Sequence, residues 1–340
     1  MKNKIDRKTI FITGGTGSFG NAMTNILLKK YKPKKIIIFS RDELKQYEMK
    51  NSILPKYLKN MRFFIGDIRD LSRLKTAMRN VDLVIHAAAL KHVPIAEYNP
   101  VEFVKTNILG SQNVIDAAIE SGVSRVIALS TDKAAAPINL YGATKLTADK
   151  LFVAANNVAG DKKTIFSVVR YGNVMNSRGS VIPLFLSKSK KDYFTVTDKE
   201  MTRFTITLEE GVNLVLKTLD IMIGGEIVVP KIPSFKILDL TKAIDDKKKI
   251  VITGIRPGEK IHEEMITSAD SLNTVEFKKF YIILPNSEFI SPKKLKEYQA
   301  LIKKNGAQKV SKNFCYNSLN NQHFLSVKEL KKLLVITSKK

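Results

Sequence analysis

A tyrosine and a lysine near the middle of the chain have the spacing of a proton-transfer pair. Tyr141 and Lys145 lie four residues apart in a segment with a helical pattern, and one turn of helix places both side chains on the same face. A neighbouring ammonium lowers the pKa of a phenol. The phenolate can then take a proton from a hydroxyl group while a hydride leaves the same carbon. Such pairs are common by chance, but this one follows a strand-like run that ends at Ser130 and Thr131, which favours a functional interpretation.

A glycine-rich segment near the N-terminus predicts a dinucleotide site. The strand-like run Thr9–Thr13 leads directly into the segment GGTGSFG, with glycines at 14, 17 and 20. Such glycines make a tight turn and let the backbone approach a pyrophosphate, and the next helix points its N-terminus at the phosphates. The motif is strong evidence when it lies between a strand and a helix. The residues predicted to contact the cofactor here are Gly14, Thr16, Gly17, Ser18, Phe19 and Gly20.

The end of the second strand-like run bears on the choice between NAD and NADP. An enzyme that uses NAD usually places an acidic residue here, which binds the 2′-hydroxyl of the ribose. This chain has Ser40 and Arg41 instead, with Lys45 close behind. A hydroxyl and a cation suit a 2′-phosphate, so the sequence predicts NADP. Asp42 is a competing acid at this place, and its alternative role is to cap a helix that begins near Glu43.

Further strand ends supply small or polar residues to the same crevice. Ligands bind beyond the carboxyl ends of the strands in sheets of this type. Asp67 follows the third run and could accept a hydrogen bond from the adenine amino group. Small residues after the fourth run leave room for ribose and diphosphate, and Lys91 lies just beyond them, with surface charge as its alternative interpretation. The additional cofactor-binding residues are therefore predicted to be Asp67, Ile68, Ala87, Ala88, Ala89 and Lys91, together with Tyr141 and Lys145.

The order of the elements predicts an α/β fold with a doubly wound parallel sheet of the Rossmann type. Short apolar runs, rich in β-branched and aromatic residues, alternate with helical patterns such as Asn21–Lys30, Pro100–Ser121 and Leu140–Asn156. This alternation is typical of parallel strands that are buried on both faces. The strand-like runs are Thr9–Thr13, Lys35–Phe39, Arg62–Ile65, Leu83–His86, Arg125–Leu129 and Ile165–Arg170.

The regular alternation ends after about Asn173. Residues 1–173 are predicted to form an NADP-binding Rossmann domain. Residues 174–340 are predicted to form mainly a smaller, discontinuous α/β substrate-binding part with a C-terminal extension. Some of these later segments are expected to return and extend the sheet.

The composition indicates a soluble protein in a reducing compartment. Hydrophobic residues make up 44% of the 340 residues, enough for a sizeable core, and no apolar run is long enough to span a membrane. A single cysteine, Cys315, excludes an intramolecular disulfide. The short basic tail before the first strand leaves no room for a signal peptide. We therefore expect a cytoplasmic protein with no membrane partner.

The net charge of +25 has nucleic-acid binding as one interpretation. The lysines, however, are scattered in pairs and triplets along the whole chain, without a dense basic arm. This distribution favours a solvated surface whose positive field helps to recruit an anionic cofactor and substrate, so no nucleic-acid partner is expected. No metal site is predicted either, because the segment HEEMI at residues 262–266 lacks the second histidine of a zinc helix motif.

These motifs resemble the extended short-chain dehydrogenase/reductase family over nearly the whole chain. Within that family the chain is similar to the inverting UDP-N-acetylglucosamine 4,6-dehydratases, which open pseudaminic acid synthesis. The segments that carry the resemblance are Arg41–Gln46 (RDELKQ), Ala87–Pro94 (AAALKHVP), Thr131–Lys133 (TDK), Asn139–Lys145 (NLYGATK), Arg170–Val174 (RYGNV) and Arg256–Lys260 (RPGEK). Common sugar-nucleotide 4,6-dehydratases carry Thr-Asp-Glu where this chain has Thr131-Asp132-Lys133.

The resemblance implies oxidation at C-4 of the sugar, loss of water across C-5 and C-6, and return of hydride to C-6. Asp132 is the candidate acid if its pKa is raised, and Lys133 is the candidate base if burial or nearby positive charge lowers its pKa. A proton that returns to the opposite face of C-5 gives an L-sugar. Thr131 and the Tyr141–Lys145 pair complete the predicted catalytic set. Whether Lys133 or Tyr141 removes the C-5 proton stays open, as does a purely structural role in which Asp132 caps a turn.

The resemblance also implies UDP-N-acetylglucosamine as the substrate. Asn173 matches a position that holds the substrate, and Thr197 and Arg256 match positions that touch the nucleotide, where an arginine fork suits a diphosphate. Asn321 has a second interpretation as a turn residue of the tail. Arg203 is either a phosphate clamp or part of a structural ion pair, and it is left unassigned. The predicted substrate-binding residues are Lys91, Asn173, Val181, Thr197, Arg256 and Asn321.

Two other functions remain open on the residues alone. A 4-epimerase on the same scaffold needs Tyr141, Lys145 and the cofactor, but it does not need Asp132 and Lys133. A non-enzymatic NADP-sensing regulator would have no use for the intact tyrosine–lysine pair. Similar proteins associate through paired long helices, so a homo-oligomer, a dimer or higher, is also expected.

Overall fold

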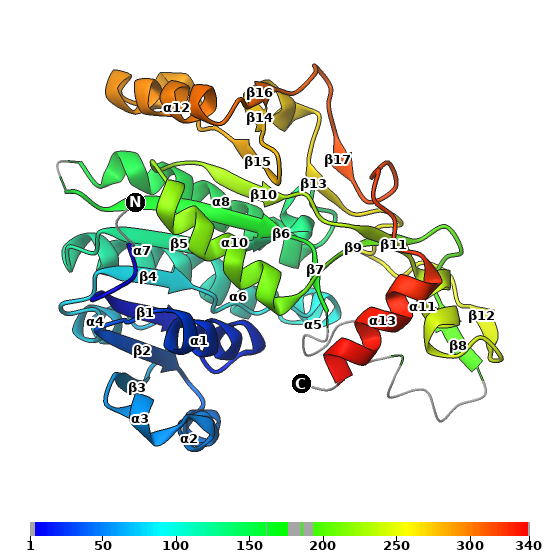
Figure 1. Cartoon of the computed structure of the whole chain (residues 1–340), viewed down its shortest axis with the longest axis horizontal. Coiled ribbons are helices and arrows are strands. Elements are labelled where there is room, and N and C mark those ends of the chain that lie inside the picture. The colour runs from blue at the N-terminus through cyan, green and yellow to red at the C-terminus, as the bar shows by residue number, and fades with distance from the viewer. Residues whose placement is uncertain (1–3, 161, 176–184, 186–192, 339–340) are drawn as a thin grey trace.

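A ten-stranded sheet forms the centre of the structure, which is a computed structural model that describes residues 4–160, 162–175, 185 and 193–338 (Figure 1). The strands run in the order β3-β2-β1-β4-β5-β6-β10-β15-β14-β16, parallel from β3 to β10 and antiparallel beyond it. The strands are β1 (Thr9–Thr13), β2 (Lys35–Ser40), β3 (Met61–Ile65), β4 (Leu83–His86), β5 (Arg125–Thr131), β6 (Ile165–Tyr171), β10 (Ile227–Pro230), β14 (Thr274–Glu276), β15 (Phe280–Ile283) and β16 (Gln308–Lys309). The strand order reverses between β1 and β4, as in a doubly wound sheet, so the predicted fold class is confirmed.

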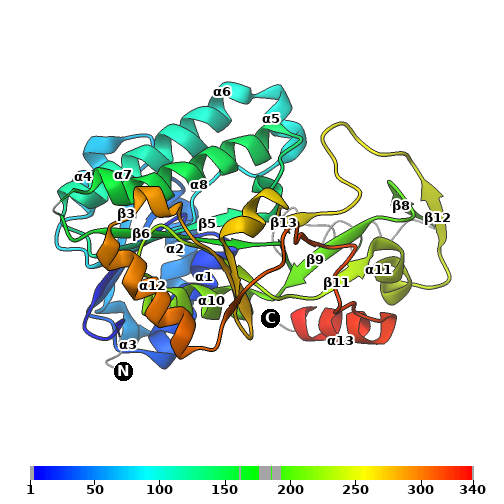
Figure 2. The same ribbon diagram turned by 90° about the horizontal axis from the view of Figure 1, so that it is seen from above.

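Helices cover both faces of the sheet, because the central strands are apolar on both sides. α4, α7 and α8 pack on one face, and α1 and α10 pack on the other (Figure 2). Every residue of β1 is buried. The helices that pack here are α1 (Ser18–Lys30), α2 (Glu43–Ser52), α3 (Pro55–Leu58), α4 (Leu71–Ala77), α5 (Val93–Tyr98), α6 (Pro100–Phe103), α7 (Gly110–Glu120), α8 (Leu140–Val158) and α10 (Leu208–Ile221).

The predicted helix Pro100–Ser121 is interrupted. α6 and α7 are joined by a π-helical turn at Val104–Leu109, a local widening of the helix that often lies near functional sites. The turn directs Asn107 at the loop after β4: its Oδ1 accepts from the Leu90 N–H at 2.9 Å, and its Nδ2 donates to the Leu90 carbonyl at 2.8 Å. The same amide donates to Thr144 of α8 at 3.0 Å. The turn therefore fixes the loop that precedes Lys91.

A second, smaller unit lies beyond the carboxyl end of β6. It has its own core, which includes Phe194, Phe235, Leu240 and Leu330. Its three-stranded sheet has the order β11-β9-β7, and β8 pairs with β12 as β13 pairs with β17. Its elements are β8 (Tyr193–Val196), β11 (Ser234–Lys236), α11 (Ile237–Ile244), β12 (Lys249–Ile252) and α13 (Val327–Ser338). Four further strands place apolar side chains in the core of the large sheet: β7 (Asn173–Val174), β9 (Thr202–Ile206), β13 (Glu264–Ile266) and β17 (Tyr316–Asn317).

A buried carboxylate fastens the antiparallel edge of the sheet. Glu226, only 1% exposed, accepts hydrogen bonds from Ser167 of β6 at 2.5 Å and from the Gly224 N–H at 2.8 Å. Tyr298 of α12 (Pro292–Lys304) donates to the same carboxylate. The C-terminal part of the chain is thereby tied to the parallel sheet. Across the described part of the chain, none of the helices combines the length and apolar character needed to cross a membrane.

Gly20 lets the first turn of α1 pack onto the glycine-rich turn. A Cβ at this position would lie 2.2 Å from the Gly15 carbonyl oxygen, which belongs to the backbone and cannot move aside as a flexible side chain could. Gly211, inside α10, offers a contrast, because a Cβ there would meet only the Tyr171 ring at 4.0 Å.

The two glycines should respond in opposite ways to alanine. We expect Gly20→Ala to lower the free energy of unfolding by about 2 kcal/mol or more, because backbone must move to admit the methyl group. Gly211→Ala should raise it by up to about 1 kcal/mol, because alanine favours a helix interior. Thermal melting of both variants measures the difference, and equal melting temperatures would contradict the packing described for α1.

Candidate active site

A long cleft of about 790 Å³ crosses the carboxyl ends of β1, β2, β4, β5 and β6. Ligands bind at this edge in doubly wound sheets. The residues predicted for the cofactor that line the cleft are Gly14, Thr16, Gly17, Ser18, Phe19, Ser40, Arg41, Lys45, Asp67, Ile68, Ala87, Ala88, Ala89, Lys91, Tyr141 and Lys145. Gly20 does not line it, since it is buried beneath the turn. Its predicted contact with the cofactor is corrected to a packing role.

The glycine-rich turn fits a pyrophosphate. Gly14 has a φ of +62°, and a Cβ there would lie 2.9 Å from the backbone of Ala88, so a side chain would fill the space. Gly17 caps α1 without any side-chain hydrogen bond to the helix. The first N–H groups of α1 are therefore free to bind an anion.

The end of β2 carries paired charges. Arg41 lies 3.7 Å from Asp67, whose carboxylate also accepts from Arg69 Nε at 2.9 Å. Asp42 accepts from the Lys45 N–H at 3.0 Å and so caps α2, which supports its interpretation as a helix cap. The Lys45 ammonium also contacts the Asp42 carboxylate. Arg41 and Lys45 are therefore cations at the rim of the cleft, and the Asp42 carboxylate serves as the cap of α2.

The end of β5 leads into the predicted catalytic residues through a short turn. Asp132–Ala134 forms one 3-10 turn, and α8 begins at Leu140. Gly142 allows these two elements to touch, because a Cβ there would lie 2.2 Å from the Lys133 carbonyl oxygen. Asn139 caps α8 by accepting from the Gly142 N–H at 2.8 Å. This contact places Tyr141 beside the turn.

Tyr141 and Lys145 share one face of α8, as predicted. Tyr141 is 8% exposed and shares a hydrogen bond with the Thr131 hydroxyl. Burial raises the pKa of Tyr141 to about 12, although the positive charge of Lys133 opposes this rise. Lys145 donates to the Leu129 carbonyl at 2.8 Å, and burial lowers its pKa. The phenol therefore needs further positive charge before it can act as a base.

Lys133 lies between two carboxylates. Its Nζ is 3.1 Å from Asp132 Oδ1 and 3.1 Å from Glu263 Oε1. Asn173 Oδ1 is 3.4 Å away. Burial alone lowers the pKa of Lys133, but the two carboxylates outweigh it and hold the pKa above that of a free lysine. The expectation that the site lowers this pKa is therefore wrong for the arrangement seen here, because the nearest charges are negative.

Asp132 meets the condition stated for an acid. Its side chain is fully buried, and Oδ2 has no hydrogen-bond partner among the described residues. Burial raises the pKa of Asp132, and the charge of Glu263 raises it further, against the opposing charge of Lys133. Thr131 Oγ1 lies 2.8 Å from Asp132 Oδ1 and also lines the cleft.

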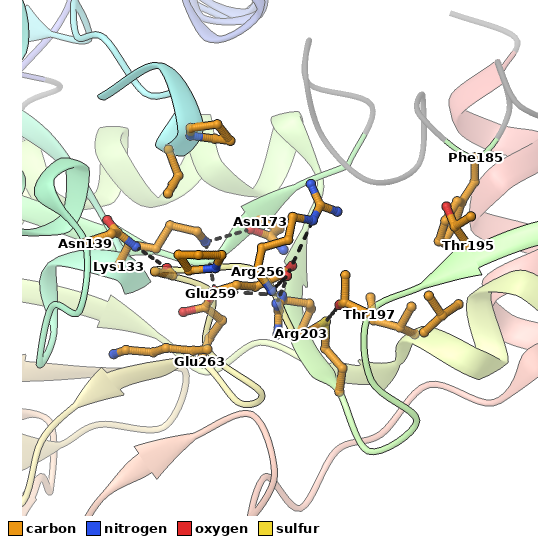
Figure 3. Close-up of a pocket in the computed structure, with 18 residues that line it drawn as sticks. Lys133, Asn139, Asn173, Phe185, Thr195, Thr197, Arg203, Arg256, Glu259 and Glu263 are labelled. Atoms are coloured by element: carbon orange, nitrogen blue, oxygen red, sulfur yellow. Dashed lines mark hydrogen bonds and ion pairs between the residues drawn. The ribbon is translucent and has the colours of Figure 1, made fainter. Parts of the chain in front are cut away.

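A second pocket, of about 270 Å³, joins the cleft at Lys133 and Asn173, which line both spaces (Figure 3). Thr197 and Arg256 line this pocket too, as predicted for substrate-binding residues. Lys91 lines the cleft rather than the pocket, and its pKa is lowered by burial and by Lys133. Val181 lies outside the described residues.

Asn321 does not line either space. Its Nδ2 donates to the Ile232 carbonyl at 2.8 Å and to Ser234 Oγ at 2.9 Å. These bonds fasten the tail to β11. These contacts support the alternative interpretation of Asn321 as a turn residue of the tail, and its substrate-binding role stays a prediction.

Two buried charged residues of the pocket had no role assigned from the sequence. Arg203 is 7% exposed, and Glu263 is 3% exposed. Arg203 donates to the Ile261 carbonyl at 2.9 Å, and its Nε lies 3.7 Å from Glu263. Figure 3 shows both side chains beside Lys133 and Asn173. Only the adjacency of Glu263 to the RPGEK segment could have drawn attention to it.

The site contains no candidate metal cluster. Within residues 4–160, 162–175, 185 and 193–338, no three His, Cys, Asp or Glu side chains gather closely enough to hold a metal ion. The glycine-rich turn and the cations after β2 fit a dinucleotide.

Known proteins resemble the chain over almost its full length. It is 56% identical over 333 residues to a UDP-N-acetylglucosamine 4,6-dehydratase (inverting) of Campylobacter jejuni, covering 97% of this chain and 98% of the relative. It is 42% identical over 336 residues to a UDP-glucose 4-epimerase of Rickettsia akari, covering 96% and 95% of the two chains. The solved structure of Pen from Bacillus thuringiensis superposes with a TM-score of 0.86 at 38% identity, covering 98% and 99%.

A family model agrees with these relatives. The model for the polysaccharide biosynthesis protein family matches residues 10–285, which span the whole parallel sheet and the pocket. The resemblance to extended short-chain dehydrogenases/reductases is thereby confirmed. The chain belongs to the polysaccharide biosynthesis protein family of extended short-chain dehydrogenases/reductases.

Proposed function

We propose that this protein is an NADP-dependent UDP-N-acetylglucosamine 4,6-dehydratase that inverts C-5 of the sugar. The observation that carries this proposal is the position of Lys133. It lines both the dinucleotide cleft and the adjoining pocket, and it lies beside a buried Asp132 whose pKa is raised. An acid and an amine at this junction suit the removal of water, and the relative at 56% identity is named for that reaction.

The pocket and the cleft divide the binding of the two nucleotides. Arg256 and Thr197 face the pocket and would hold the diphosphate and uridine of the substrate. Asn173 lies at the junction, next to Lys133, where it can orient the sugar. Arg41 and Lys45 stand at the far rim of the cleft, where they would hold the 2′-phosphate of NADP.

Oxidation starts the reaction at C-4. Bound NADP would accept a hydride from C-4 and later return it to C-6. Tyr141 takes the proton of the 4-hydroxyl. Its pKa of about 12 must fall for this step, and Lys133 already supplies positive charge in that direction.

Water loss follows at C-5 and C-6. The new ketone makes the C-5 proton acidic, and Lys133 removes it once it has given up its own extra proton. Asp132 is the source of the proton for the departing hydroxyl. Thr131 lines the cleft and lies 2.8 Å from Asp132, so its hydroxyl is the route by which that proton reaches C-6. Return of a proton to the other face of C-5 then gives the UDP-4-keto-6-deoxy-L-hexosamine.

The second candidate function is 4-epimerisation, which the relative from Rickettsia akari favours. That reaction uses Tyr141, Lys145 and the cofactor but leaves the C-5 and C-6 positions untouched. It offers no use for the buried Asp132 beside Lys133. We therefore rank it below dehydration.

The protein is also proposed to form a homo-oligomer. Large apolar side chains are exposed along α5 and the helical stretch after it: Tyr98 is 86% exposed, Val101 59% and Leu109 54%. Val158, at the end of α8, is 68% exposed. Single exposed residues are ordinary, but exposed apolar residues on several helices of one face suit a helix-to-helix interface.

Proton NMR in deuterium oxide tests the function directly. We expect purified protein with NADP to convert UDP-N-acetylglucosamine into a 4-keto-6-deoxy sugar that carries deuterium at C-5 and has the coupling constants of an L-configured ring. A product altered only in its C-4 configuration would instead establish epimerisation.

Removing either group at the junction should stop water loss. We expect Asp132→Asn and Lys133→Met to lower kcat at least about 100-fold, the usual range for a lost proton-transfer group, and to leave NADP affinity within about twofold. Asp116→Asn, on α7 and outside the lining of both the cleft and the pocket, serves as the matched control and should keep full activity. Normal turnover by either variant would refute its assigned role.

Arg41 should determine the choice of cofactor. Arg41→Ala is expected to raise the Kd for NADP about tenfold, equivalent to about 1.4 kcal/mol, while the Kd for NAD changes by less than about twofold. Arg79→Ala removes an exposed cation elsewhere and should change neither value. Fluorescence titration with both dinucleotides measures the ratio, and an unchanged ratio in Arg41→Ala would contradict the proposed phosphate contact.

A further inference from the structure

Three side-chain oxygens surround the ammonium of Lys133. Asp132 Oδ1, Glu263 Oε1 and Asn173 Oδ1 lie 3.1, 3.1 and 3.4 Å from Nζ. A lysine ammonium has three donors and no lone pair. Lys133 as seen here can therefore accept nothing, and it must lose a proton before it can act as a base.

The three acceptors differ in what they can do with that proton. The amide oxygen of Asn173 is not basic enough to keep it. Asp132 already needs a proton of its own for the departing hydroxyl. Glu263 is therefore the remaining acceptor. Its second oxygen, Oε2, is buried without a hydrogen-bond partner among the described residues.

We propose that Glu263 is the positioning residue that takes a proton from Lys133 and so turns Lys133 into the base at C-5, an inference that rests on the proposed dehydratase function. An N–H bond of Lys133 breaks as an O–H bond forms on Glu263, and the ion pair becomes an amine and a carboxylic acid. The lone pair of the amine then binds the C-5 proton, and the electrons of that C–H bond move into the C-4 ketone. As water leaves with the proton from Asp132, Lys133 is an ammonium again. Exchange with solvent then removes the proton from Glu263 and restores the one on Asp132 before the next turnover.

The backbone of Glu263 is fixed on both sides. Its N–H donates to Ser318 Oγ at 2.9 Å, and its carbonyl accepts from the Ser318 N–H at 2.7 Å. The side chain, only 3% exposed, points to the same pocket as Lys133 (Figure 3). These contacts hold the backbone that carries the carboxylate beside Lys133.

The surroundings keep the pair charged until substrate arrives. The pKa of Glu263 is held low by Lys133, Arg203 and Lys260, which outweigh the effect of burial. A sugar in the pocket displaces water, and loss of solvation favours a neutral pair over an ion pair. The charged or titratable groups that face Lys133 and Glu263 are Asp132 of the same turn, Arg203 of β9, Lys91 after β4, Tyr141 of α8 and Lys260.

The pH profile of Glu263→Gln separates this role from a structural one. In the unaltered protein the proton moves internally, so kcat should be flat between about pH 6.5 and 9. The glutamine keeps the size and a hydrogen bond but cannot take a proton, so Lys133 must release it to water. We expect kcat to fall at least about tenfold at pH 7 and then to rise about tenfold per pH unit.

Matched variants and a second measurement complete the test. Glu263→Asp should restore the flat profile, and Glu264→Gln, whose carboxylate instead contacts Cys315, should behave like the unaltered protein. Exchange of the C-5 proton of the isolated 4-keto product with deuterium oxide follows the base alone, without hydride transfer. The exchange rate of each variant should depend on pH in the same way as its kcat.

The outcomes distinguish this inference from the proposed function. If the unaltered protein makes no 4-keto-6-deoxy product, the proposed function fails. If it does, two results would overturn the role of Glu263. In the first, Glu263→Gln lowers kcat by the same factor at every pH. In the second, kcat of the unaltered protein already rises with pH, and Glu263→Gln has a higher kcat than the unaltered protein at neutral pH. If Glu263→Gln does not fold, the rates of C-5 proton exchange in Glu263→Asp and in Glu264→Gln are compared instead.

Discussion

The ion pairs of Lys133 are the interaction on which the site depends. They join the turn after β5 to Glu263, which directly precedes β13. Removing one partner from such a buried cluster leaves an uncompensated charge, which costs several kcal/mol. Packing also fixes the position of Lys133, because Gly142 lets α8 lie directly against the Lys133 carbonyl. The pocket and the cleft meet at Lys133, where the ion pairs and this packing contact hold the turn in place.

Local patterns were sufficient to predict the parallel sheet and the cofactor cleft. The glycine-rich turn is recognisable because a phosphate needs backbone at close range, and that requirement is met within a few neighbouring residues. The Tyr141–Lys145 spacing is equally local, since one helical turn determines it. These predictions concern residues that are close in sequence, and the structure brings them together at the edge of the sheet.

Contacts between distant residues were not predictable in the same way. Glu263 lies 130 positions beyond Lys133 in the sequence, so no spacing could show that it reverses the expected pKa shift of the lysine. Asn321 was assigned to the substrate, although its amide is used to hold the tail. The π-helical turn that places Asn107 is likewise set by packing against Leu90 and Thr144, which the helical pattern of Pro100–Ser121 does not show.

The pairing of Glu263 with Ser318 has a consequence for how the protein is made. Synthesis proceeds from the N-terminus, so the glycine-rich turn, β5 and α8 leave the ribosome long before Ser318 does. A nascent chain could bury its parallel sheet and bind a dinucleotide while Glu263 is still without its backbone support. If Glu263 takes a proton from Lys133, as proposed, that role depends on the docking of the C-terminal segment that carries Ser318.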